Sequence, residues 1–473
     1  MTAEGVGSGA SHPNPLGTER ITKLIFKYSM PAIISGVVGA VYNMVDQIFI
    51  GWGIGELGIA ATNIAFPFTT VCLALALLFG TGGAARMSLS LGKGDPEQAR
   101  AFAGSSLGML AISGIIIGAV SLIFLEPLLL LFGTTDTVMI YAKPYSLIIA
   151  YGFPFHIFSM GASNILRADG NPGASMICTT SGAVFNLIAD PLFMFGCGMG
   201  IEGIALATTL GQVLSTLLAL YFLLFKSKVV KFKARYFKIK PFMIAATCAL
   251  GMSGCVSQIA MTVVQIVTNN QLKNYGAVSS FGSDIPLAVV GAVTKLTMLF
   301  IIVIFSVGQG CQPIMGYNYG AKNYGRVIDT YKKAALFLCM YTLIVFLCLE
   351  IFPVPMLRIF GAESDAFFQF GARYTRIHMM MMLINCIQVF STMLFTSIGK
   401  AFVGLILTLV RQSLFLIPLL YVLPIFIGLD GVLFAAPIAD VLSFILAVVF
   451  IIREFRNITM LRNAMPVSHL GVL

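Results

Sequence analysis

Charged side chains are scarce in this chain. Only 10% of its 473 residues are Asp, Glu, Lys or Arg, whereas 58% are hydrophobic, and the mean hydropathy is +0.93. Soluble domains carry about 25% charged residues. So few charges cannot cover the surface of a 473-residue protein in water, which excludes an ordinary soluble enzyme or binding domain. Most of the chain is therefore expected to lie in the lipid bilayer.

Cysteine and histidine patterns that hold a metal ion or a disulfide framework are also missing. The nine cysteines are scattered singly without a C-x-x-C pair, and the four histidines form no H-x-x-x-H pair. A membrane enzyme would need a nucleophile, a base or a metal ion at one depth, and these residues do not supply such a set. The sequence therefore predicts neither an enzyme nor a bound cofactor.

Long apolar stretches are what the chain has in abundance. A membrane-spanning helix needs about 20 apolar residues to cross a hydrocarbon core of about 30 Å. Twelve such stretches alternate with short polar loops, which predicts an all-α membrane protein with twelve transmembrane helices. They are expected near residues 25–50, 59–85, 101–125, 142–165, 173–196, 203–225, 242–270, 284–308, 334–353, 374–396, 402–426 and 431–452.

The two halves of the chain match each other at an offset of 228 residues. Gly82 corresponds to Gly310 and Gly92 to Gly320, and the register holds through the later helices with one single-residue slip. A shared register of this length indicates duplication. Six spans per half place both halves in the same orientation, so we expect two pseudo-twofold-related six-helix lobes with the substrate between them.

This repeat and the basic loops predict how the chain is divided. Lys and Arg gather in alternate loops, which hold 22 of the 29 basic residues, and the positive-inside rule then places both termini in the cytoplasm. The net charge of +10 therefore indicates topology and not nucleic-acid binding. The predicted parts are a cytoplasmic tail (1–20), an N-lobe with helices 1–6 (21–225), a basic cytoplasmic linker (226–240), a C-lobe with helices 7–12 (241–452) and a cytoplasmic tail (453–473).

Five ionisable side chains fall inside predicted spans, where each costs at least about 2.5–3.5 kcal/mol and is a candidate functional residue. Lys295 is interpreted in three ways: it repels cations, pairs with Asp440, or extends its ammonium group toward the membrane surface. The full set is Asp46, Asp190, Lys295, Arg411 and Asp440.

Counting from the outer turns places four polar residues at one depth. Asp190 and Thr208 lie nine residues on either side of the turn near Met199, and Asp46 lies eight residues before the turn that follows the first helix. At about 1.5 Å per residue this is roughly 12 Å below the turns. Asn186 shares a helix face with Asp190. Such a set could hold a proton or a hard cation such as Na⁺; alternatively, each Asp caps or hydrogen-bonds locally.

In combination, these residues resemble the multidrug and toxic compound extrusion (MATE) family over nearly the whole chain. The segment that ends at Lys322 is similar to a bacterial subgroup of that family. The matching motifs are Tyr42-Asn43 before Asp46 with Pro31 upstream, the Leu166–Pro172 turn, Asn186-x-x-x-Asp190-Pro191, the Gly200-x-x-Gly203 turn leading to Thr208, and the segment Gln312–Lys322.

The resemblance implies a secondary active antiporter of a bacterial cytoplasmic membrane. It would export bulky, often cationic or aromatic small molecules in exchange for inward H⁺ or Na⁺ by alternating access, as a monomer and without a cofactor. The family's N-lobe cation site would map onto Asp46, Asn186, Asp190 and Thr208. A second cation site is not expected, because Lys295 occupies the C-lobe helix where some members place a carboxylate.

Further polar residues are candidates for the substrate cavity, although amides in spans also bond between helices. A second candidate function is a lipid-linked precursor flippase of the same superfamily. Flippases of this kind tend to have a basic cavity and extra helices, so twelve spans and an acidic site favour the antiporter. The cavity candidates are Tyr42, Asn43, Gln258, Gln265, Asn269, Lys295 and Asp440.

Overall fold

The computed structural model describes residues 14–229, 236, 240–279, 281–282, 284–358 and 365–464. These residues form a bundle of helices, and no strand occurs among them. Most of the predicted linker 226–240 and the first 13 residues of the N-terminal tail lie outside the described residues.

The first half of the chain runs through seven long or medium helices, several of which end in a short π-helical turn. Its elements are α1 (Pro15–Thr18), α2 (Ile21–Gly53), α3 (Glu56–Ala76), η1 (Leu77–Thr81), α4 (Gly82–Gly92), α5 (Pro96–Ile123), α6 (Leu125–Leu131), α7 (Asp136–Ala168), α8 (Pro172–Pro191), η2 (Leu192–Gly196), α9 (Ile201–Tyr221) and η3 (Phe222–Lys226).

The second half repeats this order. Its elements are α10 (Pro241–Ala277), α11 (Asp284–Gly320), α12 (Tyr324–Ile351), α13 (Pro353–Arg358), α14 (Asp365–Met379), α15 (Met382–Ser397), α16 (Ala401–Leu409), η5 (Val410–Leu416), α17 (Ile417–Ile427) and α18 (Leu429–Asn463).

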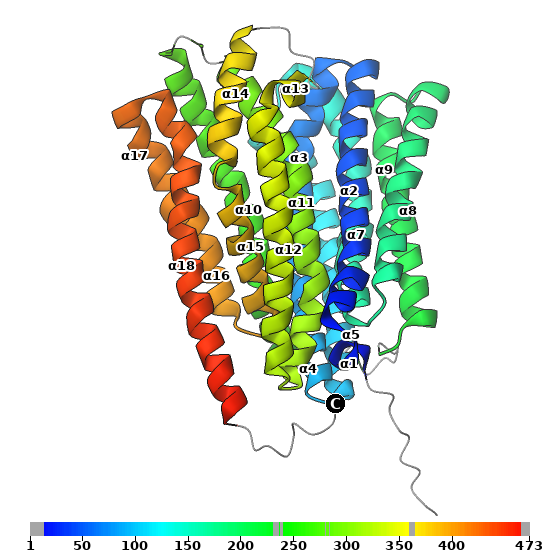
Figure 1. Cartoon of the computed structure of the whole chain (residues 1–473). Coiled ribbons are helices and arrows are strands. Elements are labelled where there is room, and N and C mark those ends of the chain that lie inside the picture. The colour runs from blue at the N-terminus through cyan, green and yellow to red at the C-terminus, as the bar shows by residue number, and fades with distance from the viewer. Residues whose placement is uncertain are drawn as a thin grey trace, which may run out of the picture.

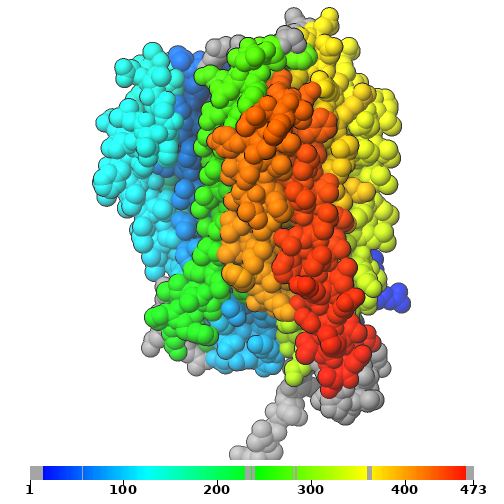
Figure 2. Space-filling model, turned by 90° about the vertical axis from the view of Figure 1, so that its left-hand side faces the viewer, coloured from blue at the N-terminus to red at the C-terminus, as the bar shows by residue number. Residues whose placement is uncertain are grey.

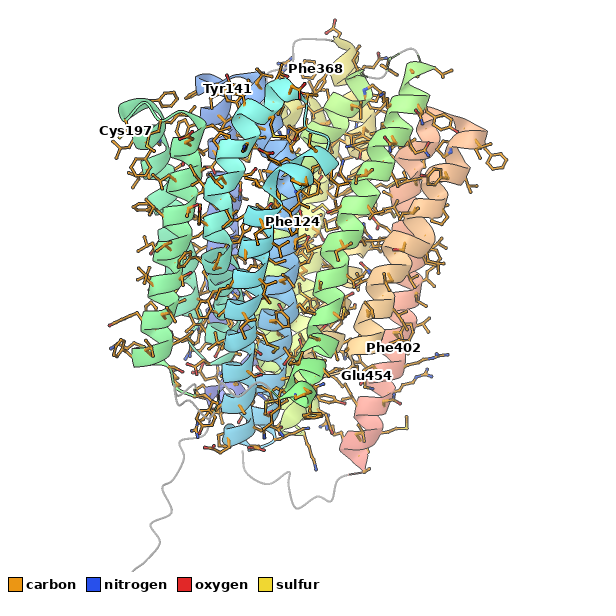
Figure 3. The ribbon with its side chains drawn as sticks, turned by 180° about the vertical axis from the view of Figure 1, so that it is seen from behind. Phe124, Tyr141, Cys197, Phe368, Phe402 and Glu454 are labelled. Atoms are coloured by element: carbon orange, nitrogen blue, oxygen red, sulfur yellow. The ribbon has the colours of Figure 1, made fainter. Side chains whose placement is uncertain are left out.

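The predicted number of spans agrees with the structure. Within the described residues, eleven helical segments are long and apolar enough to cross a membrane, and α14 and α15 form a further span that bends by 47°. Large apolar side chains such as Phe124 and Phe402 point outward from the bundle, as lipid-facing residues do (Figure 3). The helices are longer than predicted: α11 continues through Pro313 to Gly320, and α18 continues to Asn463, because hydropathy marks only the apolar part of a helix and not its polar end.

Both described ends of the chain lie at the same end of the bundle (Figure 1). We call this end, which holds α1, α4 and the C-terminal turns of α18, the terminal end, and the opposite end the far end. Figure 2 shows α10 lying between helices of the N-lobe (α2–α9) and helices α16–α18 of the C-lobe (α10–α18). The helix α2 starts in a hydrophobic cluster that it shares with α11, α12 and α15, so the first helix bridges the two lobes.

Paired glycines from the sequence repeat show that the lobes interlock reciprocally. A Cβ atom on Gly82 would lie 2.2 Å from the carbonyl oxygen of Thr247 in α10, the first helix of the C-lobe. A Cβ atom on its repeat partner Gly310 would lie 2.8 Å from the Cα atom of Ser29 in α2, the first helix of the N-lobe. Each lobe therefore packs its second helix against the first helix of the other, as two pseudo-twofold-related lobes should.

The second glycine pair closes the terminal end. A Cβ atom on Gly92 would lie 2.0 Å from the carbonyl oxygen of Tyr317, and one on Gly320 would lie 2.2 Å from that of Leu89. Only residues without a side chain allow α4 and α11 to approach this closely. The two lobes are thus in backbone contact at the terminal end.

Replacing either glycine should weaken this closure. Gly92→Ala or Gly320→Ala forces a methyl group into a neighbouring backbone, and overpacking of this kind costs about 1–3 kcal/mol. Thermal unfolding of the purified protein should therefore shift to lower temperature in both variants. Gly39→Ala is the control, because a Cβ atom at Gly39 meets nothing within 4 Å; equal shifts in all three variants would contradict the interlocked packing.

Candidate functional site

Four polar side chains from three N-lobe helices meet in the interior of the structure. Asp46 comes from α2, Asn186 and Asp190 come from α8, and Thr208 comes from α9. Only 8% of Asp46, 2% of Asn186 and none of Asp190 is exposed. The structure therefore brings together the set that the depth count had indicated.

Asn186 is the centre of the hydrogen bonds in this cluster. Its Nδ2 atom donates to Oδ1 of Asp190 at 3.0 Å and to Oγ1 of Thr208 at 3.1 Å. The first bond follows from the i, i+4 spacing on one helix face. Because the Thr208 oxygen accepts from Asn186, the hydroxyl hydrogen of Thr208 remains available to donate.

The two carboxyl groups lie within hydrogen-bonding range of each other. Ionised carboxylates only accept hydrogen bonds, so such a pair needs one shared proton or a bound cation. Three buried oxygens of the cluster have no hydrogen-bond donor among the described residues: Oδ1 of Asp46, Oδ2 of Asp190 and Oδ1 of Asn186. Unsatisfied buried acceptors are costly. The arrangement can therefore bind H⁺ or a hard cation through oxygen ligands.

The local fold of α8 keeps its end irregular next to the acidic pair. Pro191 has no backbone N–H, so the carbonyl of Leu187 cannot receive the usual i→i−4 hydrogen bond. The π-helical turn η2 follows directly from Leu192 to Gly196. Turns of this kind are frequent at functional sites, and here the π-helical turn begins two residues after Asp190.

Two tyrosines complete the surroundings of the acidic pair. Tyr42 of α2 and Tyr145 of α7 both interact electrostatically with Asp46 and Asp190. Tyr42 was expected from its place in the motif, but Tyr145 was missed. It lies twelve residues after the outer glycine Gly133, deeper than the eight or nine residues counted for the other positions, so the depth count alone would not have found it.

The ionisable residues of the C-lobe do not form the Lys295–Asp440 pair that was one interpretation of the sequence. Nε of Arg411 donates to Oδ1 of Asp440 at 2.7 Å, joining η5 to α18. Lys295 of α11 is exposed and, in the part of the chain that the structure describes, forms no ion pair. Asp440 therefore pairs with Arg411 and not with Lys295; Arg411 lies in the span Ala401–Ile427, which directly precedes α18.

The predicted amides do not gather at one place. Nε2 of Gln265 donates to Oδ1 of Asn269 at 2.8 Å within α10, and both side chains are exposed. Nδ2 of Asn43 donates to the carbonyl of Gly39 at 2.7 Å, one turn earlier in α2. Gln258 is half-buried on α10. These hydrogen bonds are local, so they satisfy the amides within their own helices.

An all-α, membrane-spanning protein of two six-helix lobes with a buried polar site has the architecture of a secondary transporter. A family model, MatE, matches residues 31–192 and 254–422. The chain therefore belongs to the MatE family. Members of this family are transporters, which defines the chain as a transporter and not an enzyme.

Relatives of known name match nearly the whole chain. The Multidrug export protein MepA of Staphylococcus haemolyticus (strain JCSC1435) is 24% identical over 439 residues, covering 92% of this chain and 94% of the relative. MepA of Staphylococcus aureus (strain MSSA476) is 24% identical over 441 residues with the same coverage of 92% and 94%.

Solved structures share the fold. A multidrug resistance MATE family transporter of the MOP superfamily in an outward-facing conformation superposes with a TM-score of 0.88 at 23% identity, covering 94% of this chain and 98% of that one. A MOP superfamily transporter from Pyrococcus furiosus, described as having a binding pocket of reverse polarity, gives a TM-score of 0.87 at 23% identity, covering 94% and 98%.

Proposed function

We propose that the protein is a secondary active multidrug antiporter, which exports bulky cationic or aromatic small molecules in exchange for inward H⁺. The observation that carries this proposal is the Asp46–Asp190 pair, buried within hydrogen-bonding range in an apolar bundle. The printed names of the relatives, which are multidrug export proteins, support the substrate class. We place the protein as a monomer in a bacterial cytoplasmic membrane, with its basic terminal end in the cytoplasm.

The helix α2 links the ion site mechanically to the interface between the lobes. Asp46 lies at the ion site, whereas Ser29, about 26 Å away along the same helix, packs against Gly310 of the C-lobe. Loss of the shared proton leaves two carboxylates that repel each other. That repulsion moves α2 relative to α8 and shifts the balance between the two lobe arrangements, which is the differential interaction that alternating access requires.

The acidic site also favours the antiporter function over the second candidate, a lipid-linked precursor flippase. A buried pair of carboxyl groups offers no attraction to the phosphate of a lipid-linked precursor, whereas a cationic drug and H⁺ can compete for the same negative charge. The structure also contains no more spans than the twelve of the two lobes within the described residues. Both observations favour cation export.

Neutralising either carboxyl group should abolish coupling. Asp46→Asn or Asp190→Asn removes the proton carrier but keeps the size of the side chain, so near-complete loss of gradient-driven efflux of ethidium from proteoliposomes is expected with unchanged size-exclusion profiles. Asp430→Asn is the matched control, because Asp430 pairs at the surface with Arg373 and exposed pairs contribute about 0–1 kcal/mol. Normal efflux with normal pH dependence in either test variant would refute the coupling role.

Thr208 distinguishes the coupling ions. A hydroxyl oxygen belongs to the ligand shell of a Na⁺ ion, whereas a proton on a carboxyl group has little need of it. With H⁺ as the carrier, Thr208→Val should retain most of the efflux and its pH dependence. Loss of efflux in this variant, together with parent activity that follows Na⁺ at fixed pH, would replace H⁺ by Na⁺.

A further inference from the structure

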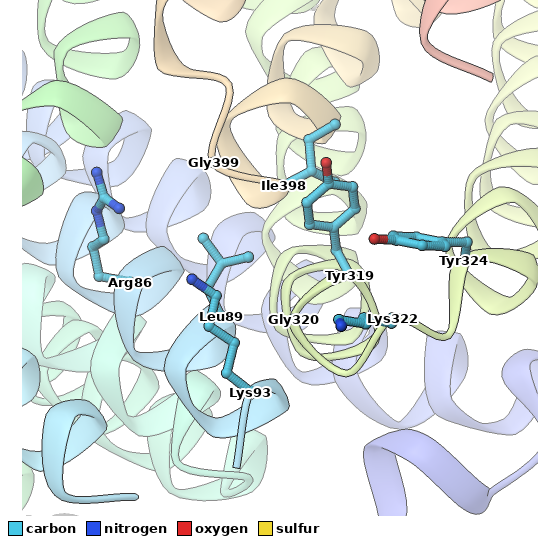
Figure 4. Close-up of a pocket in the computed structure, with 9 residues that line it drawn as sticks. All are labelled: Arg86, Leu89, Lys93, Tyr319, Gly320, Lys322, Tyr324, Ile398 and Gly399. Carbon is cyan, nitrogen blue, oxygen red and sulfur yellow. The ribbon is translucent and has the colours of Figure 1, made fainter. Parts of the chain in front are cut away.

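A pocket lies between the lobes at the terminal end, far from the acidic pair. It has a volume of about 410 Å³ and is shown in Figure 4. The helix α4 of the N-lobe supplies Arg86 and Lys93, and the C-lobe supplies Tyr319 from α11, Lys322 from the following turn and Tyr324 from α12. The two lobes therefore build this pocket jointly.

The pocket is lined by cations and hydrogen-bond donors. Its lining residues include no Asp or Glu. Among the described residues, Arg86, Lys93 and Lys322 form no ion pair with a carboxylate. The tyrosines add two hydroxyl groups, and their rings meet edge to face with centroids 5.5 Å apart. Three uncompensated positive charges in one concave site attract an anion.

Arg86 is held in a position from which it can bind an anion in the pocket. Its Nε atom donates to the carbonyl of Ala246 in α10 at 2.9 Å, across the lobe interface. The two terminal nitrogens of the guanidinium group remain for a ligand, and this planar donor suits a phosphoryl group. One acid, Glu454, interacts electrostatically with the pocket residue Tyr319, but Glu454 is paired with Lys400. Its charge is therefore already compensated.

The backbone conformation of Lys322 indicates a functional role for this lysine in the pocket. Lys322 has φ 61°, and in the residues that the structure describes no other non-glycine residue has positive φ. The repeat offset of 228 residues places Gly94 at the same position of the N-lobe, where φ is 77°. The first half thus uses glycine for this turn, as its conformation favours, whereas the second half keeps a strained lysine directed to the pocket. Strain of this kind persists mainly at functional sites.

We propose that this pocket, formed by Arg86, Lys93 and Lys322 with Tyr319 and Tyr324, binds a phosphoryl group carried either by an anionic lipid headgroup or by free phosphate. Basic pockets between transmembrane helices are known to hold anionic headgroups. Because both lobes line the site, it is complete only when α4 and α11 are together. A bound phosphoryl group therefore stabilises the arrangement that is closed at the terminal end.

Binding can be measured on the full chain without any ion gradient, so the result does not depend on the proposed transport function. The purified protein is placed in phosphatidylcholine nanodiscs, and its melting temperature is followed in two titrations. One titration adds inorganic phosphate, and the other replaces phosphatidylcholine with phosphatidylglycerol. Native mass spectrometry then counts the phosphatidylglycerol molecules that the protein retains.

The test variant is the double substitution Lys93→Gln/Lys322→Gly, which removes two pocket charges. Its Lys322→Gly component copies the N-lobe repeat, so it should fold at least as well as the parent. The matched control is Lys332→Gln/Lys333→Gln, which makes the same change in net charge at two exposed positions of α12 outside the pocket. Arg86 is left unchanged because of its bond to α10.

In the parent and in the control, the melting temperature should rise saturably with probe concentration. In the test variant, the concentration that gives half of the maximal rise should be at least about tenfold higher, as for one lost charged contact. A rise with phosphatidylglycerol alone assigns a lipid headgroup, a rise with phosphate alone assigns a free anion, and a rise with both assigns the phosphoryl group itself. No rise in the parent, or equal rises in all three proteins, would overturn the proposal.

Discussion

Two carboxyl groups buried beside each other in an apolar bundle set the conditions for the rest of this structure. Removing both charges from water costs several kcal/mol per ion, and in the part of the chain that the structure describes no basic residue is a hydrogen-bond partner of Asp46 or Asp190. The pair therefore needs a proton or a cation to remain buried. Asn186 and Thr208 fix its geometry, and each change in occupancy alters the repulsion between α2 and α8.

The architecture turns this local requirement into a property of the whole molecule. The helix α2 carries Asp46 but begins in a hydrophobic cluster with α11, α12 and α15 of the other lobe. The reciprocal contacts of Gly82 with α10 and Gly310 with α2 allow the lobes to meet without side chains between them. Packed interfaces of this kind favour a few discrete arrangements over continuous deformation. Discrete lobe arrangements can therefore correspond to the ion-bound and the ion-free state of the site.

The sequence predicted the spans, the repeat and the four-residue cluster, because each depends on local hydropathy or on counting along a helix. The Arg411–Asp440 pair was not predicted: both residues were identified, but the partner depends on which helices are neighbours. Tyr145 was missed because its interaction with the acidic pair depends on how α7 packs against the other N-lobe helices. The basic pocket required knowledge of how α4 and α11 meet. Helix ends were also misjudged, since α18 continues to Asn463 past the apolar stretch.

The most direct test of the account is the number of protons released when a cationic substrate binds. Purified protein in weakly buffered solution near neutral pH, with a pH indicator, is titrated with ethidium in the absence of Na⁺. The account predicts proton release that saturates together with ethidium binding in the parent and is absent when both Asp46 and Asp190 are Asn. Full ethidium binding without proton release, or the same release in the double variant, would contradict it.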